Sequence, residues 1–293
     1  MTTFIFIDNW VLGSLQEPRF FDALKKYILD NNYTVLFSSL SLVELYNPGW
    51  QNSNGPERTQ HAVKFYASVP CVVVDPSDVW KEEIKNRLDT IDQLPIRLDL
   101  RDIEDEFREV TLLRFLREDP LFLDQGKDIR EWVKNYNEIK KTWLVEVEKI
   151  IDNALKDGYL ERDCMGKLCK FNEHKELFLN SLDMRHAPRE EVDAILNYQV
   201  SKRGSQKFVK IASVRMASLI FWYLYVKIDP ANKIKPQNSD IGDLYHLSLL
   251  PYCKAFTADK SMCRLVRRIK EPCVPIGCRV FSRPDLLKVI GLK

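Results

Sequence analysis

A short apolar run near the start of the chain constrains the fold most. Residues 4–7 read Phe-Ile-Phe-Ile, and Asp8 and Asn9 follow directly. An apolar run without polar alternation is typical of a strand that is buried on both faces, as in a parallel sheet covered by helices. The sequence therefore predicts that Asp8 and Asn9 lie at the carboxyl end of a central strand.

The following segments alternate between helical and strand patterns. A helix begins at Pro18, a strand covers residues 34–37, a short helix carries Glu44, and a third strand covers residues 71–74. After residue 229 the pattern resumes with a helix that opens at Asp240 and Asp243 and ends at about residue 250. A strand at residues 255–258 and Asp259 follow. Strand, helix and strand in succession imply a parallel sheet with right-handed crossovers.

The middle of the chain has a different character. In residues 77–228 apolar side chains recur at intervals of three and four among many charges, which predicts a large all-helical insertion. We therefore expect an α/β core formed by residues 1–76 and 229–293. The longest apolar stretch, residues 216–226, is shorter than the roughly 20 residues of a membrane span. It predicts a buried helix and no membrane partner.

Composition restricts the cellular setting. The first residues lack a signal-peptide pattern, so a cytoplasmic protein is expected. The chain has seven cysteines, an odd number that favours free thiols over a disulfide framework. Because no tight Cys-x-x-Cys pair is present, the cysteines also give little support for structural zinc.

Charge is distributed unevenly. With 44 basic and 42 acidic residues the net charge is only +2, so the whole chain makes no electrostatic case for a nucleic-acid partner. Residues 200–228, however, contain six Lys or Arg and no acid, and residues 260–293 contain nine bases and two acids. These segments would attract a phosphate backbone. The candidate contacts are Lys202, Arg203, Lys207, Lys210, Lys260, Arg264, Arg267 and Arg268.

Four carboxylates are expected at one edge of the predicted sheet. Asp8 and Asp259 follow strands, whereas Glu44 and Asp243 lie in helices that begin nearby. Converging carboxylates repel one another unless a cation neutralises them, and hard oxygen ligands suit Mg²⁺ or Mn²⁺. Asp240 lies on the same helix face as Asp243 and is the alternative third acid.

Each of these residues also has an ordinary structural explanation. A single Asp after a strand commonly forms a turn or caps a helix. Asn9, Ser38 and Ser39 could assist by holding a water or a phosphate oxygen, or could simply cap helices. His246 could contact a phosphate, or could be a satisfied core residue. The order of the acids along the chain is what favours a shared site.

That order resembles the PIN-domain nuclease family. Residues 4–12, FIFIDNWVL, are similar to its first strand with Asp8. Residues 35–45, VLFSSLSLVEL, are similar to its second strand and the turn into the helix of Glu44. Residues 240–262, DIGDLYHLSLLPYCKAFTADKSM, are similar to its third-acid helix and last strand, with Asp243 and Asp259. The resemblance implies a PIN-like α/β fold and Mg²⁺- or Mn²⁺-dependent cleavage of RNA, less often DNA. It also suggests a toxin or defence component whose partner is an antitoxin or a second copy.

Two alternatives to a nuclease remain. One is a PIN-like module that binds nucleic acid or protein without cutting, with the helical insertion as its working surface. Retention of every acidic position favours the enzyme over this module. The other is a metal-dependent phosphatase, which the lack of a Gly-rich phosphate loop and of a nucleophile motif does not support.

Overall fold

The computed structural model describes residues 2–38, 40, 41, 44, 55–86, 93–118, 129–158, 160–162, 168, 169, 212–226, 237–269 and 278–292. Five residues named above lie outside these ranges: Ser39, Lys202, Arg203, Lys207 and Lys210. Arg268 lies within a helix, but its side chain is outside the described part of the structure.

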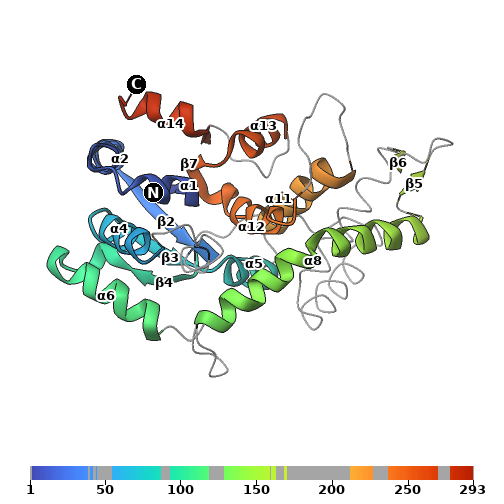
Figure 1. Ribbon diagram of the computed structural model, residues 1–293, viewed down its shortest axis with the longest axis horizontal. Helices are drawn as coiled ribbons and strands as arrows, with labels where there is room; N and C mark the ends of the chain where they lie inside the picture. Colours follow the sequence, from blue (N-terminus) through green and yellow to red (C-terminus); the bar gives the residue numbers. More distant parts are fainter. Residues whose placement is uncertain are drawn as a thin grey trace.

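A six-stranded sheet forms the centre of the protein (Figure 1). Its order is β4-β3-β2-β1-β7-β8, and neighbouring strands are parallel except for β3 and β4. The strands are β1 (Thr3–Phe6), β2 (Tyr33–Ser38), β3 (Cys71–Val74), β4 (Ile96–Asp99), β7 (Cys253–Thr257) and β8 (Arg279–Phe281). The predicted strands at residues 34–37, 71–74 and 255–258 therefore match β2, β3 and β7.

Successive residues of the central strands point to opposite faces of the sheet and enter two separate cores. In β1, Ile5 belongs to the first core and Phe6 to the second. In β2, Phe37 belongs to the first core and Leu36 to the second. Burial on both faces explains why these strands are continuous apolar runs in the sequence.

Helices cover both faces of the sheet (Figure 1). The first face is covered by α1 (Asn9–Ser14), α2 (Pro18–Asp30), α4 (Gly55–Ala67), α6 (Asp105–Glu118) and α14 (Arg283–Val289). The second face is covered by α5 (Pro76–Asn86), α8 (Ile129–Lys156), α11 (Ala212–Phe221), α12 (Asp240–Leu247) and α13 (Lys260–Arg268). The α/β layering was predicted correctly.

Two expectations need correction. The sheet is mixed rather than parallel, because β4 pairs antiparallel with β3. The segment 77–228 is not all helical, because it contains β4 and a small separate pair of strands, β5 (Glu161–Arg162) and β6 (Leu168–Cys169). In addition, Leu112 and Leu116 of α6 pack into the core on the first face of the sheet. The division of the chain into a core and an insertion remains a prediction.

The apolar stretch at residues 216–226 is a buried helix, as predicted. It forms the end of α11 and the π-helical segment η3 (Trp222–Val226). The predicted helix from Asp240 ends earlier than expected, at Leu247, and a short 3₁₀ turn, η4 (Leu250–Tyr252), leads into β7. Within the described part of the chain, none of the helices has the length and apolar character needed to cross a bilayer.

Candidate active site

Asp8 lies just beyond the end of β1, where its backbone contacts the last residue of β7. Its backbone N–H donates to Thr257 Oγ1 at 2.7 Å, and the Thr257 hydroxyl lies 3.4 Å from the carbonyl oxygen of Phe6. The Asp8 carboxylate caps α1 by accepting from the Asn9 N–H at 2.8 Å. Thr257 thus joins the carboxyl ends of the two strands and holds Asp8 at this edge.

Asp259 lies on the same edge, two residues after the end of β7. It is the N-cap of α13, where its Oδ1 accepts from the N–H of Met262 at 2.7 Å. Asp259 is an exposed residue, whereas Asp8 is partly buried. The helix-capping role that the sequence left open is therefore present for both Asp8 and Asp259.

Glu44 reaches the site from the short segment after β2 and is largely buried. Its side chain is 14% exposed, and its Oε2 lies 4.0 Å from Nε2 of His246. Its Oε1 accepts a hydrogen bond of 2.6 Å from the phenol of Tyr136 on α8. Burial raises the pKa of Glu44, while the Tyr136 hydrogen bond and the charge of Lys140 lower it.

Asp240 and Asp243 both lie in the first turn of α12, and the structure gives them different surroundings. Asp240 Oδ2 accepts from the Tyr225 phenol at 3.0 Å and from the Gln237 N–H at 2.9 Å. Asp243 has no comparable donor in the described part of the structure. Its pKa is raised well above the ordinary value, first by burial and then by the charge of Asp8.

Five acids form one electrostatic group, which we call the acidic cluster: Asp8, Glu44, Asp240, Asp243 and Asp259. Asp8, Asp259, Glu44 and Asp240, in that order of size, all contribute to the raised pKa of Asp243. The pKa of Asp8 rises to about 6, chiefly through burial, with smaller increases from Glu44 and Asp259. Acids from four distant segments of the sequence are therefore close enough for their charges to act on Asp243.

His246 lies beside the cluster and is neutral at pH 7. It is 3% exposed, and burial lowers its pKa to about 4 against a smaller opposing effect of Asp8. Its contact with Glu44 is therefore not an ion pair. Its ring lies 5.1 Å from that of Phe6, and Nε2 has no hydrogen-bond partner among the described residues. The imidazole is thus a core residue with one buried nitrogen that has no hydrogen-bond partner among the described residues.

The other two predicted assisting residues that the structure describes differ in whether their side-chain oxygen already has a hydrogen-bond partner. Asn9 is 6% exposed, and its Oδ1 lacks a hydrogen-bond partner in the described ranges. Ser38 is fully buried, and its hydroxyl accepts from the Leu40 N–H at 3.2 Å, as a turn-forming serine does. Asn9 therefore has an oxygen available beside Asp8, whereas Ser38 is already used in the backbone turn.

The donor chemistry of the acidic cluster fits a hard divalent cation. It consists of carboxylate oxygens, and the buried Asn9 Oδ1 and His246 Nε2 have no partners of their own among the described residues. The geometry, in contrast, is not that of a formed metal site. Within the same ranges, no three His, Cys, Asp or Glu side chains are grouped so as to hold a metal ion. Asp8, Asp240 and Asp259 are instead turned toward N–H or O–H donors. Coordination would require these carboxylates to turn toward Asp243.

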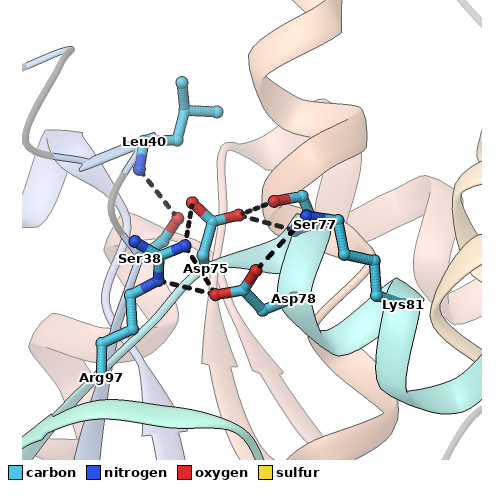
Figure 2. Close-up of polar contacts among 7 residues, drawn as sticks. All are labelled: Ser38, Leu40, Asp75, Ser77, Asp78, Lys81 and Arg97. Carbon is cyan, nitrogen blue, oxygen red and sulfur yellow. Dashed lines mark hydrogen bonds and ion pairs between the residues drawn. The ribbon is translucent and has the colours of Figure 1, made fainter. Parts of the chain in front are cut away.

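A second polar network lies at the end of β3 (Figure 2). Asp75 accepts from the N–H and the hydroxyl of Ser77 at 2.7 and 2.5 Å and so caps α5. Arg97 of β4 pairs with Asp78 at 2.6 Å and lies 4.0 Å from Asp75. Asp75 follows β3 much as Asp8 follows β1. Its carboxylate, however, already caps α5 and lies beside the guanidinium of Arg97.

The basic residues of α13 follow directly from Asp259. Lys260 and Arg264 are exposed. The Arg267 guanidinium instead donates to the carbonyl of Val280 and to Asp285, both at 2.8 Å, and so ties α13 to the start of α14. Lys260 and Arg264 are therefore the clearer candidates for a phosphate contact.

Tyr136, Lys140 and Arg97 were not predicted from the sequence. Tyr136 and Lys140 lie four apart on α8, with the Lys140 ammonium 5.3 Å from the centre of the Tyr136 ring. Their spacing marks one helix face, but nothing in the sequence indicates that this face meets Glu44. Arg97 was missed because β4 lies in a segment that was expected to be helical.

Comparison with known proteins reveals no relative. No family model matches the chain, and no curated protein or solved structure is significantly similar to it. A function is therefore inferred from the residues of the acidic cluster and their surroundings.

Proposed function

We propose that the protein is a divalent-metal-dependent nuclease that hydrolyses phosphodiester bonds in RNA. The observation that carries this proposal is the position of the acidic cluster. Asp8 and Asp259 lie at the carboxyl ends of β1 and β7, Asp240 and Asp243 lie in the first turn of α12, and Glu44 contacts His246 of the same helix. The raised pKa of Asp243 agrees with this arrangement. Clustered, largely buried carboxylates are costly unless a cation or a proton compensates them. Perturbed carboxylates at the carboxyl edge of an α/β sheet are also a common sign of an active site.

The roles of the side chains follow from their chemistry. Asp8, Glu44, Asp243 and Asp259 would hold Mg²⁺ or Mn²⁺, with Asp240 as the alternate ligand. When bound, the metal supplies an activated water and stabilises charge on the phosphate oxygens. Lys260 and Arg264 on α13 would hold the phosphate backbone against the repulsion of the acids. Neutral His246 would leave the negative charge of the cluster for the metal to compensate.

A specific observation favours the alternative of a non-catalytic binding module. Among the described residues the carboxylates are not arranged as a ready metal site. Four of the five acids already accept a hydrogen bond from a backbone N–H or a phenol, and two of these four cap helices. Under this alternative the acidic residues have structural roles and the basic residues bind the partner. An antitoxin or a second copy of the chain as partner remains a prediction under both proposals.

Cleavage assays distinguish these proposals. We expect the purified full chain to cut single-stranded or structured RNA in Mn²⁺ or Mg²⁺ and to stop when EDTA removes the metal. A DNA strand of the same sequence should be cut more slowly. If RNA is bound but neither RNA nor DNA is cut with any divalent ion, the non-catalytic module is the correct function. If DNA is cut faster than RNA, the proposed phosphodiester hydrolysis is correct but RNA is not the preferred substrate.

Charge reversal on α13 should weaken RNA binding without removing the acidic cluster. For Lys260→Glu or Arg264→Glu, the slope of log affinity against log salt should fall by about 0.7 for each single-strand phosphate that the protein no longer neutralises. The measurement is fluorescence anisotropy with labelled RNA in EDTA at several salt concentrations. Lys64→Glu is the matched control, because Lys64 is exposed on α4 on the other face of the sheet. An equal loss in the control would mean that net charge, not α13, governs affinity.

A further inference from the structure

Tyr136 connects α8 to the acidic cluster. It comes from the middle segment of the chain, 92 positions from Glu44, and yet its phenol donates to Glu44 Oε1 at 2.6 Å. Tyr136 is 7% exposed, so this hydrogen bond is shielded from water. A short bond to a largely buried carboxylate stabilises its charged form and also fixes the direction of its oxygens.

The contact lies directly against a glycine of the neighbouring helix. A Cβ atom at Gly242 of α12 would lie in hard contact with the Tyr136 hydroxyl and 2.6 Å from Glu44 Oε1. Any larger residue at this position would force the phenol or the carboxylate to shift. The next residue, Asp243, belongs to the acidic cluster. The position that admits Tyr136 is thus directly beside the central acid.

Further contacts hold α8 in this place. The Trp143 indole donates to the Tyr225 phenol at 2.8 Å, and that phenol donates to Asp240 at 3.0 Å. The Leu144 N–H donates to Asn238 Oδ1 at 3.0 Å, just before α12. Figure 1 shows α8 running past α11 and α12. Two turns of α8 thus connect with two different acids of the cluster.

We propose that Tyr136 is a positioning residue that orients Glu44 to bind the divalent cation. The hydrogen bond engages Oε1 and leaves Oε2, which lies 4.0 Å from His246, available for coordination. Loss of a partner that holds a metal ligand in this way typically weakens metal binding by about 10- to 100-fold. The inference rests on the proposed function, and it makes α8 part of the active site.

Calorimetry with Mn²⁺ alone tests this role without relying on cleavage. Tyr136→Phe removes only the phenol oxygen, and we expect the dissociation constant for Mn²⁺ to rise by about 10- to 100-fold. Gly242→Ala should weaken Mn²⁺ binding in the same way, because the new methyl group displaces the pair. Melting temperatures and near-UV circular dichroism of the metal-free proteins show whether each variant is folded.

Tyr252→Phe is the matched control. The Tyr252 phenol donates to Glu83, a fully buried glutamate on α5 outside the acidic cluster. Removal of the Tyr252 hydroxyl should lower the melting temperature about as much as Tyr136→Phe does, and it should leave the Mn²⁺ affinity unchanged. If folded Tyr136→Phe binds Mn²⁺ as the wild type does, or if Tyr252→Phe weakens binding equally, Tyr136 has no positioning role. If the wild type itself binds no Mn²⁺, the proposed function fails, and this inference fails with it.

Discussion

Asp243→Asn should abolish RNA cleavage while leaving RNA binding intact. Asp243 is the acid on which the charges of all other members of the acidic cluster act. Asparagine keeps the shape of the side chain but removes the anionic oxygen that a divalent cation requires. Without the metal the reaction loses several kcal/mol of transition-state stabilisation, which lowers the cleavage rate by at least about 1,000-fold. Single-turnover cleavage with saturating Mn²⁺ measures this effect, and anisotropy in EDTA measures binding.

Asp240→Asn is the control for the choice of the third acid. Asp240 Oδ2 already accepts hydrogen bonds from the Tyr225 phenol and the Gln237 N–H. The amide oxygen of asparagine at this position can accept both of them. We expect only a modest decrease in rate, within about 10-fold of wild type, as for a residue that acts through its neighbours. If Asp240→Asn abolishes cleavage and Asp243→Asn does not, the enzyme remains and the assignment of the two acids must be exchanged.

The central strands were predictable because burial on both faces leaves a direct trace in the sequence. Residues 4–7 and 71–74 are continuous runs of apolar β-branched or aromatic residues, apart from Cys71, and they form most of β1 and all of β3. Parallel strands end at a common edge, so the positions of Asp8 and Asp259 followed from the strands alone. The sequence therefore sufficed to place both of these residues at this edge of the sheet.

The edge strand β4 was not predictable by the same reasoning. Its sequence, Ile-Arg-Leu-Asp, alternates apolar and charged residues, and it is too short to be separated from the helical patterns around it. All four of its residues are only partly buried. It becomes a strand because β3 offers a free edge for antiparallel pairing. That is a tertiary effect, and local sequence carries little of it.

The surroundings of the acids were also beyond the sequence. That Glu44 meets Tyr136 depends on where a helix 92 positions away docks. That Arg267 is engaged with Asp285 depends on how α13 packs against β8 and α14. Residue types and spacing thus sufficed to name the acids as candidates. The partners that set their orientation and pKa depend on helix packing, which the sequence does not reveal.

Mn²⁺ should raise the melting temperature of the wild type, and Asp8→Asn should remove most of this response. At 100 times its dissociation constant a bound ion adds about 2.7 kcal/mol to the free energy of unfolding, which corresponds to about 5 °C for a chain of this size. Asp8 contributes a charged oxygen whose repulsion by Glu44 and Asp259 the ion would relieve. Scanning fluorimetry with Mn²⁺, Mg²⁺ and EDTA measures the shift.

The same variant should be more stable than the wild type when metal is absent at pH 7. The pKa of Asp8 is raised from 3.8 to about 6, chiefly by burial, so its ionised form opposes folding. This cost is absent below about pH 4 and fully present above about pH 6, and the wild type should lose stability as pH rises between them. A shift of this size corresponds to on the order of 2–3 kcal/mol.

Urea unfolding in EDTA at pH 4 and pH 7 measures this difference, and Asp8→Asn should show a gain in stability only at pH 7. The cap on α1 should survive the substitution, because the amide that replaces the carboxylate keeps an oxygen that can accept from the N–H of Asn9. Any gain therefore reports the removed charge rather than a change in the helix cap. A variant that is less stable than wild type at pH 7, or that responds to Mn²⁺ as the wild type does, would remove Asp8 from the metal site.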